Sequence, residues 1–316
     1  MHLRGLTLKI IFSSVGNAEK LIPVGAAHHT LLLRGQAVLP NLQEIVLDYI
    51  PPLNPSLACI SRPFRNVSKL SIQYTSFATL LDLRRIINNF FPNLQHLILD
   101  NPRFTSQSLQ VIPPSSKATG TSLTTLNLII NGDQFAPLRS WLPSTNTRTT
   151  LKILNLRIGG GYVDRFTVQP LLLDCGSNVR ELRVRWSQDT DVDPNGILMS
   201  IGLHVLPVLE ILRFELHEAE LMTLCTILSE KLSPLLATIA LRVFAFKPEQ
   251  AVKETWAALD ETLTHPQLSH VKQFHFSCFD GNREIYINLD GVWTKQLLPK
   301  LTAKSPVRDG EEVWSD

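Results

Sequence analysis

Five arginines occupy equivalent places in a repeated apolar pattern of this 316-residue sequence. Each repeat reads L-x-x-L-x-L, where L is an aliphatic residue and x is any residue. Side chains alternate between the two faces of a strand, so the last x and the residue two places further on point away from an apolar core. The arginines at these outward places are Arg157, Arg183, Arg185, Arg213 and Arg242.

These guanidinium groups could bind carboxylate or phosphate groups, whose oxygens match a planar fork of N–H donors. Neighbouring strands of a sheet lie about 4.8 Å apart, so arginines of successive repeats would share one patch. We expect this patch to bind a protein, or an acidic or phosphorylated peptide, through Asn155, Arg157, Arg183, Arg185, Trp186, Arg213, Glu215 and Arg242. The alternative is a solvated face on which the arginines pair with Glu181 and Glu215.

An acidic stretch, "DTDVDPNG" at 189–196, matches the first half of an EF-hand calcium loop. The twelfth position of such a loop should be a bidentate Glu, but it is Gly202 here. We therefore expect an acidic turn in which Asp193 or Asn195 caps the following helix.

Other candidate sites are incomplete. The glycines of 157–162 are not followed by either of the common phosphate-loop patterns. The segment "HEAE" at 217–220 lacks the second His of a zinc protease helix, and the adjacent His28 and His29 have no nearby Cys or acid. The sequence therefore predicts no cofactor, no metal site and no catalytic residues, and the protein is expected not to be an enzyme.

The apolar frame begins at ten places, namely residues 3, 42, 67, 94, 123, 151, 179, 209, 236 and 271. Most of the intervals are 25–30 residues long. A strand that recurs at this period predicts a solenoid, in which no unit buries its apolar face alone and neighbouring units stack. The alternative is an α/β domain with βαβ crossovers, but no glycine-rich phosphate loop follows the first strand.

Helices are predicted between the strands. Apolar residues recur with a period near 3.6 in 77–90, 217–232 and 248–265. Prolines precede several of the predicted strands, where they end the return segment without removing a donor from the sheet. These are Pro40, Pro92, Pro143, Pro207 and Pro234.

The composition is that of a globular protein, with 44% hydrophobic and 18% charged residues. The formal net charge of +2 argues against a general binder of nucleic acids or membrane surfaces. The four cysteines are scattered, as in proteins of a reducing compartment, and no apolar run has the length of a membrane span. We expect a cytoplasmic or nuclear monomer.

The stretch "FRNVSKLSIQYTSFATLLDLRRIINNFFPNLQHLILDN" at 64–101 resembles the leucine-rich repeat region of fungal F-box proteins of the mushroom type. Segments 254–276 and 297–308 resemble the closing part of the same family. The resemblance implies one α/β solenoid of about ten units over residues 1–301, with parallel strands on the concave face and helices on the convex face. Residues 302–316 are expected to form a polar, disordered tail.

The resemblance also implies a function. Such a protein would be a non-catalytic recognition scaffold, the substrate-receptor region of an F-box-type ubiquitin-ligase subunit. In that family a helical F-box with an L-P-x-E-x-L stretch binds the ligase adaptor, but here the first repeat frame follows Met1 directly. We expect the adaptor as a partner only if an upstream F-box exists. The alternatives are an F-box-free repeat scaffold unrelated to ubiquitin and, beyond that, an unrecognised α/β enzyme.

Overall fold

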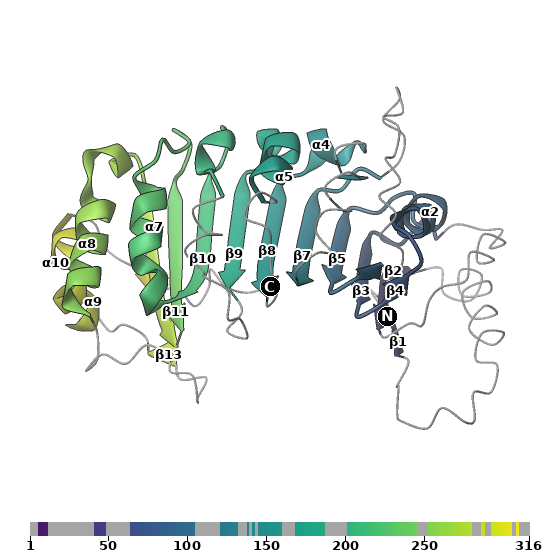
Figure 1. Cartoon of the computed structure of the whole chain (residues 1–316), viewed down its shortest axis with the longest axis horizontal. Coiled ribbons are helices and arrows are strands. Elements are labelled where there is room, and N and C mark those ends of the chain that lie inside the picture. The colour runs from purple at the N-terminus through teal and green to yellow at the C-terminus, as the bar shows by residue number, and fades with distance from the viewer. Residues whose placement is uncertain are drawn as a thin grey trace. The chain divides into compact units, whose positions relative to one another are not determined.

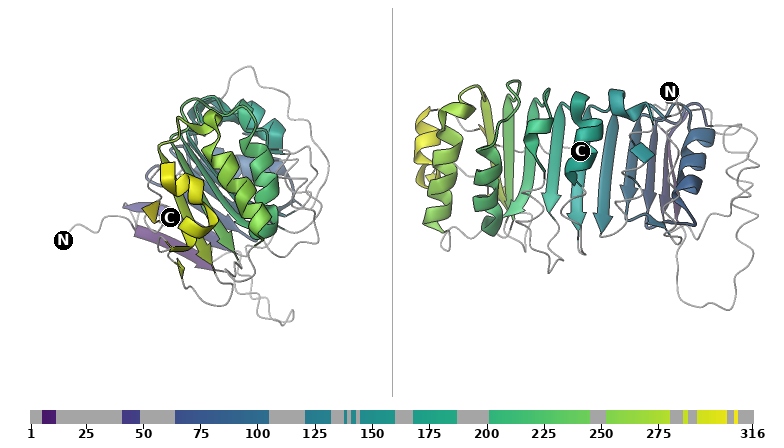
Figure 2. Two further views of the ribbon diagram at one scale, coloured as in Figure 1. Left: turned by 90° about the vertical axis from the view of Figure 1, so that its left-hand side faces the viewer. Right: turned by 45° about the horizontal axis from the view of Figure 1, so that its top comes forward.

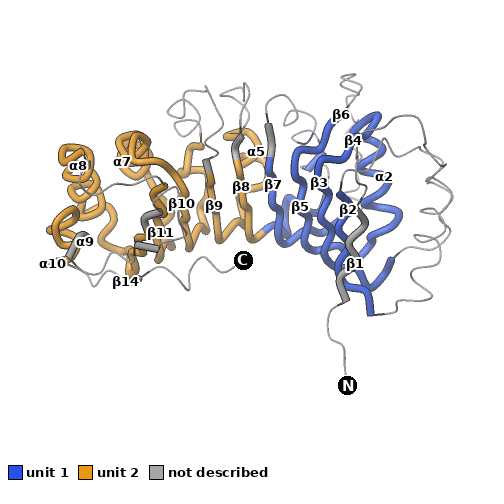
Figure 3. The backbone as a smooth tube through the Cα atoms, turned by 90° about the horizontal axis from the view of Figure 1, so that it is seen from below, with its two compact units in different colours: residues 1–151 blue, residues 152–316 orange. Residues whose placement is uncertain are grey.

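The computed structural model divides into two compact units, residues 1–151 and residues 152–316 (Figure 3). It describes residues 6–11, 41–48, 64–104, 121–131, 138, 141–142, 145–159, 168–186, 201–244, 252–279, 286–287, 292–304 and 308–309. The calcium-loop candidate at 189–196 and the adjacent His28 and His29 lie outside these residues.

The first unit is built on a parallel sheet of repeat strands (Figure 1). Its strands follow one another in chain order as β1 (Leu6–Ile11), β2 (Leu42–Asp48), β3 (Lys69–Gln73), β5 (His96–Asp100) and β7 (Thr125–Asn131). The frame leucines stand in register, since Leu97 pairs with Leu70 on one side and Leu126 on the other. All three are fully buried, so the leucines of successive repeats stack into one core.

Helix α2 (Leu80–Phe90) covers the core of the first unit after β3. Asp82 accepts hydrogen bonds from the backbone N–H and the hydroxyl of Thr79, at 2.9 and 2.8 Å, and so fixes the start of the helix. Leu83 and Ile87 are buried on its inner face. Before the helix, β4 (Ser76–Phe77) pairs with β6 (Arg103–Phe104) as a second, two-stranded sheet. A short helix, α4 (Thr147–Thr150), precedes the end of this unit.

The second unit repeats the plan with β8 (Ile153–Gly159), β9 (Glu181–Trp186), β10 (Ile211–His217), β11 (Thr238–Phe244) and β12 (Gln273–Phe279). These strands are parallel and lie in chain order. Beyond them, β12 also pairs with two short strands, antiparallel with β13 (Tyr286–Ile287) and parallel with β14 (Arg308–Asp309).

Helices lie along one face of the sheet in the second unit (Figure 2). They are α5 (Val168–Cys175), α7 (Leu221–Leu228) and α8 (Lys253–Thr264), with α9 (Val292–Leu297) and α10 (Pro299–Lys304) near the C-terminus. One-turn 3₁₀ helices lie in the connections between the strands, namely η4 (Gly176–Asn178), η5 (Leu203–Val205), η6 (Glu218–Glu220) and η8 (Pro266–Leu268). The core between sheet and helices is apolar and includes Leu182, Phe214, Ile239 and Trp256.

A glycine allows one close approach in this core. A Cβ atom placed on Gly176 would lie 2.4 Å from Cδ2 of Leu206, which is fully buried. Real Cβ atoms do not come so close to another carbon, so the η4 turn can meet Leu206 only because residue 176 has no side chain.

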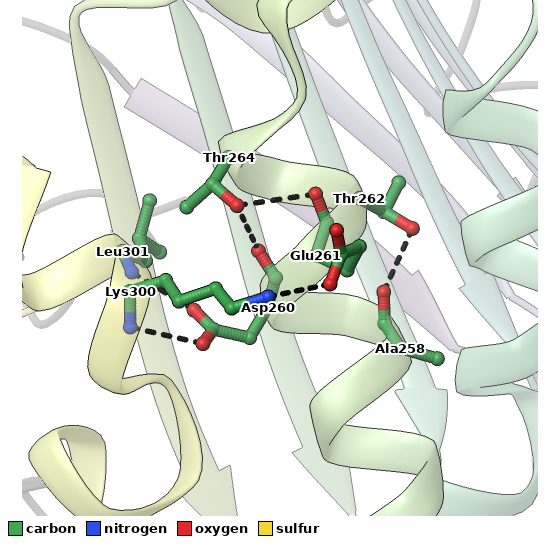
Figure 4. Close-up of polar contacts among 7 residues, drawn as sticks. All are labelled: Ala258, Asp260, Glu261, Thr262, Thr264, Lys300 and Leu301. Atoms are coloured by element: carbon green, nitrogen blue, oxygen red, sulfur yellow. Dashed lines mark hydrogen bonds and ion pairs between the residues drawn. The ribbon is translucent and has the colours of Figure 1, made fainter.

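Two polar links join successive repeats of the helical layer. The indole N–H of Trp256 in α8 donates to Glu218 at 2.6 Å, and the same carboxylate oxygen accepts the backbone N–H of Val252 at 2.9 Å. At the other end of α8, the carboxylate of Asp260 accepts the backbone N–H groups of Lys300 and Leu301, while Lys300 also pairs with Glu261 (Figure 4).

The predicted repeat fold is confirmed, since a parallel repeat strand lies at each of the ten frames. The helices are shorter than the predicted segments: 77–90 contains α2 from Leu80, 217–232 contains η6 and α7, and 248–265 contains α8. Helix α10 begins at Pro299 and extends to Lys304, into the segment 302–316 that was predicted as a tail, and β14 (residues 308–309) lies inside that segment. The rest of that segment lies outside the described residues.

Candidate functional site

The residues of the predicted patch form two rows across the sheet of the second unit. The first row runs from Asn155 through Arg183 and Arg213 to Ala240, each paired in register with the next strand. The second row, two residues further along the strands, consists of Arg157, Arg185, Glu215 and Arg242. Register pairing brings together these residues, which are as many as 85 positions apart in the chain.

Both rows lie on the face of the sheet opposite its apolar core. Leu182 and Val184, which alternate with the arginines of β9, are buried at 0% and 1% exposure. Arg183 and Arg185 therefore project from the other side. We call this side, defined by the two rows and by Glu181, the arginine face.

Glu215 is the centre of the arginine face. Its side chain has no exposed surface, and its Oε1 atom lies 2.5 Å from Nη2 and 2.7 Å from Nε of Arg183. Its Oε2 atom lies 3.3 Å from Nε of Arg185 and 3.9 Å from Nη1 of Arg242. One buried carboxylate thus contacts two arginines of β9 and one arginine of β11, the two strands next to its own. Glu215 therefore holds the three guanidinium groups in a common arrangement.

Arg213 has a different counter-ion. Its Nε atom lies 3.0 Å from Oε1 of Glu181, and only 15% of its side chain is exposed. Burial lowers the pKa of Arg213, the neighbouring charge of Arg183 lowers it further, and Glu181 and Glu215 oppose the shift. The attraction of these two carboxylates therefore does not outweigh the loss of solvation that burial causes at Arg213.

Among the arginines that form ion pairs on this face, Arg185 is the most exposed, with 40% of its side chain accessible. Its guanidinium carbon lies 5.5 Å from the ring centre of Phe244, a cation–π distance. The ring of His217 lies 6.0 Å from that of Phe244, and burial lowers the pKa of His217. Contacts on two sides, with Glu215 and with Phe244, therefore fix the orientation of Arg185.

Sequence reasoning missed Phe244 and His217. Phe244 lies two residues after Arg242, and His217 lies two residues after Glu215. Because side chains alternate along a strand, the same rule would have placed both on the arginine face.

Exposure is not uniform across the arginine face. Towards β12 it is buried, since Ala240, Arg242, His275 and Ser277 are each less than 9% exposed. Towards β8 and β9 it is partly accessible at Arg157 and Arg185. Among the residues that the structure describes, no carboxylate lies within ion-pair distance of Arg157. The accessible part of the patch is therefore its β8–β9 end.

The structure brings together every residue of the predicted patch except Trp186. Asn155, Arg157, Arg183, Arg185, Arg213, Glu215 and Arg242 lie in the two rows. Trp186 is the last residue of β9 and pairs with Ile158, but its side chain lies outside the described residues. The ion pairs expected in the alternative interpretation are also present, although Glu215 is buried instead of solvated.

The described residues offer few groups for other chemistry. No group of three or more His, Cys, Asp or Glu side chains among them could hold a metal ion. Cys175 and Cys225 are buried and form no disulfide, and burial raises the pKa of Cys225. Within the described part of the chain, no helix has both the length and the apolar character that crossing a membrane requires.

The comparisons with known proteins identify the fold alone. No family model matches the sequence, and no curated protein gives a significant match. Among solved structures, the leucine-rich repeat-containing protein LegL7 from Legionella pneumophila is similar, with a TM-score of 0.51 and 14% sequence identity. The similarity covers 96% of this chain and 99% of that protein, so the fold is that of a leucine-rich repeat protein.

Proposed function

We propose that this protein is a non-catalytic recognition scaffold whose arginine face binds an acidic segment of a partner protein. One observation carries the proposal: among the described residues of the second unit, five arginines and two glutamates lie in register on one face of the sheet. An excess of fixed positive charge favours a partner that brings carboxylate or phosphate groups.

The proposed mechanism is presentation of charged groups on a rigid surface. The arginines project from strands held in a sheet, and Glu215 and Phe244 restrict the side chain of Arg185. Binding then costs less conformational entropy than it would for arginines on a flexible loop, because fewer rotamers remain to be lost. The leucine-rich repeat fold supports this role, since a repeated sheet offers an extended surface to a partner.

The test is binding of a short polyglutamate peptide to the whole protein and to the double variant Arg157→Ala/Arg185→Ala. We expect the double variant to lose at least about tenfold in affinity, the effect of removing two charge-assisted contacts. Arg180→Ala is the matched control, because Arg180 is exposed, precedes β9 and pairs with Glu210 at 3.1 Å. Equal affinities of parent and double variant would exclude the arginine face as the binding surface.

As the wider role, we propose the substrate-receptor region of an F-box-type ubiquitin-ligase subunit in the cytoplasm or nucleus. The support is the spacing of apolar and aromatic residues in 64–101 and 254–276, which resembles fungal F-box proteins. The ligase adaptor would be a partner only through an upstream F-box. Mapping the 5′ end of the transcript and purifying the tagged full product tests this: co-purification of the adaptor supports it, whereas a product without an F-box favours a repeat scaffold unrelated to ubiquitin.

A further inference from the structure

We infer that Phe244 is a positioning residue of the arginine face, which holds the guanidinium of Arg185 in the orientation that binds a carboxylate of the partner. This inference rests on the proposed function and specifies how that site recognises its ligand. Recognition at Arg185 would then depend on the planar shape of the guanidinium as well as on its positive charge.

The contact between Arg185 and Phe244 joins two strands that are not neighbours. Arg185 lies on β9 and Phe244 is the last residue of β11, while β10 runs between these strands. Two strand spacings amount to about 10 Å. The guanidinium carbon of Arg185 nevertheless lies 5.5 Å from the centre of the Phe244 ring, so the two side chains meet over β10. The direction in which Arg185 crosses the sheet is therefore fixed at its far end.

The contacts of Arg185 occupy different parts of its guanidinium. The Nε atom lies 3.3 Å from Oε2 of Glu215, its register partner on β10, and the guanidinium carbon lies over the Phe244 ring. The two Nη groups carry four of the five N–H donors of a guanidinium. Because 40% of the Arg185 side chain stays exposed, a ligand would meet Arg185 at the edge formed by these Nη groups.

A carboxylate fits such an edge. Its two oxygens accept two parallel N–H groups of one guanidinium, a geometry that requires the two planes to be aligned. A ring beneath the guanidinium fixes that plane, since arginine stacks on aromatic faces. A lysine ammonium has the same charge but no plane and no paired donors, so it could not take over this role.

A purely structural role for Phe244 is the alternative. Its ring also lies 6.0 Å from that of His217, its register partner on β10, so its loss could disturb the sheet without involving Arg185. The experiment therefore needs variants that separate the ring, the guanidinium and the charge from one another.

The experiment measures the affinity of a short polyglutamate peptide for the whole protein by fluorescence anisotropy at constant ionic strength. Arg185→Lys keeps the charge, and we expect it to lose at least about fivefold in affinity. Phe244→Leu keeps an apolar side chain without the ring, and it should lose about threefold to tenfold. Phe244→Tyr restores the ring and should bind as the parent does, as should the exposed control Arg180→Ala.

A second comparison tests whether Phe244 acts through Arg185. Residues that work through one contact show non-additive effects. Phe244→Leu should therefore cause no further loss of affinity in the Arg185→Ala background. Thermal unfolding verifies that each variant is folded. An equal loss in both backgrounds would mean that Phe244 acts on the sheet in general, and it would overturn the inference.

The remaining failures are distinguishable. Parental affinity of Arg185→Lys or of Phe244→Leu would overturn this inference and leave the proposed function in place, because charge alone would then explain binding. Unchanged affinity of the double variant Arg157→Ala/Arg185→Ala would overturn the proposed function, and this inference with it. Failure of the parent to bind polyglutamate would have the same consequence.

Discussion

Asp260 of α8 accepts a hydrogen bond from the backbone N–H of Leu301 in α10 at 2.8 Å. Its second oxygen accepts the backbone N–H of Lys300 at 2.9 Å, and Asp260 is only 2% exposed (Figure 4). The first N–H groups of a helix have no partner within that helix, so a carboxylate at this point satisfies two of them. Asp260 thereby attaches α10 to α8 in the helical layer of the second unit.

Replacement of Asp260 with Ala should destabilise the protein. The buried N–H of Leu301 and the partly buried N–H of Lys300 would lose a charged acceptor, which costs about 3 kcal/mol in the free energy of unfolding. Urea denaturation followed by circular dichroism measures this change. Glu261→Ala serves as the control, because Glu261 is the exposed neighbour that pairs with Lys300, and it should leave the denaturation midpoint unchanged. A midpoint for Asp260→Ala equal to that of Glu261→Ala would refute the attachment.

The repeat strands could be predicted from the sequence because the L-x-x-L-x-L frame reports burial and strand alternation together. Leu97 and Leu99 illustrate this, since both are fully buried on β5 while His96 and Ile98 alternate with them. The start of α2 could not be predicted in the same way. Phe77 joins the predicted apolar stripe, but it belongs to β4, whose register partners in β6 lie 27 residues further on. Local periodicity does not reveal such pairing.

The site was partly predictable for the same reason. Strand alternation placed Arg183, Arg185 and Arg213 on one face, and parallel register made them neighbours. The sequence did not show that Glu215 is buried beneath three guanidinium groups, because that depends on side-chain packing from β9, β10 and β11. Hydrophobicity patterns treat a Glu at an outward position as solvated.

The contact of Gly176 with Leu206 predicts that Gly176→Ala destabilises the second unit. The added methyl group would overlap Cδ2 of Leu206, which has no exposed surface to move into. Overpacking of this kind costs about 1–3 kcal/mol. The double variant Gly176→Ala/Leu206→Ala provides the check, since truncation of Leu206 removes the overlap. The two changes should cost less together than the sum of the single costs, and strict additivity in denaturation would contradict the close approach.

Glu220 should make stability depend on pH. It is 3% exposed, and burial raises its pKa from 4.5 to about 7, although it accepts the backbone N–H of His217. Between these two values the folded state holds a proton that the unfolded state releases, so the stability contributed by protonated Glu220 falls as the pH rises.

The comparison of parent and Glu220→Gln isolates this effect from other titrating groups. Gln keeps an acceptor for the N–H of His217 but does not titrate. The stability of the parent relative to Glu220→Gln should decrease by about 2–3 kcal/mol between about pH 5 and about pH 7.5. A difference that stays constant or increases over this range would show that Glu220 is already ionised in the folded protein.

Glu215 should be essential for stability as well as for the arrangement of the arginine face. Glu215→Ala would leave Arg183, Arg185 and Arg242 without the carboxylate that they share, two of them with 16% and 10% of their side chains exposed. Removal of one partner from a buried ion pair costs about 3–5 kcal/mol. Glu210→Ala is the matched control, because Glu210 forms an ion pair with Arg180 in which both side chains are exposed, at 42% and 61%. Surface pairs of this kind contribute about 0–1 kcal/mol.

A second change shows whether charge causes the loss. Arg242→Met in the Glu215→Ala background removes one of the buried positive charges that Glu215 contacts and keeps an apolar side chain in its place. We expect this double variant to be more stable than Glu215→Ala alone, because fewer like charges then repel one another in a poorly solvated site. If Arg242→Met lowers the stability of Glu215→Ala further, the cost of losing Glu215 arises from packing and not from the arginines that it neutralises.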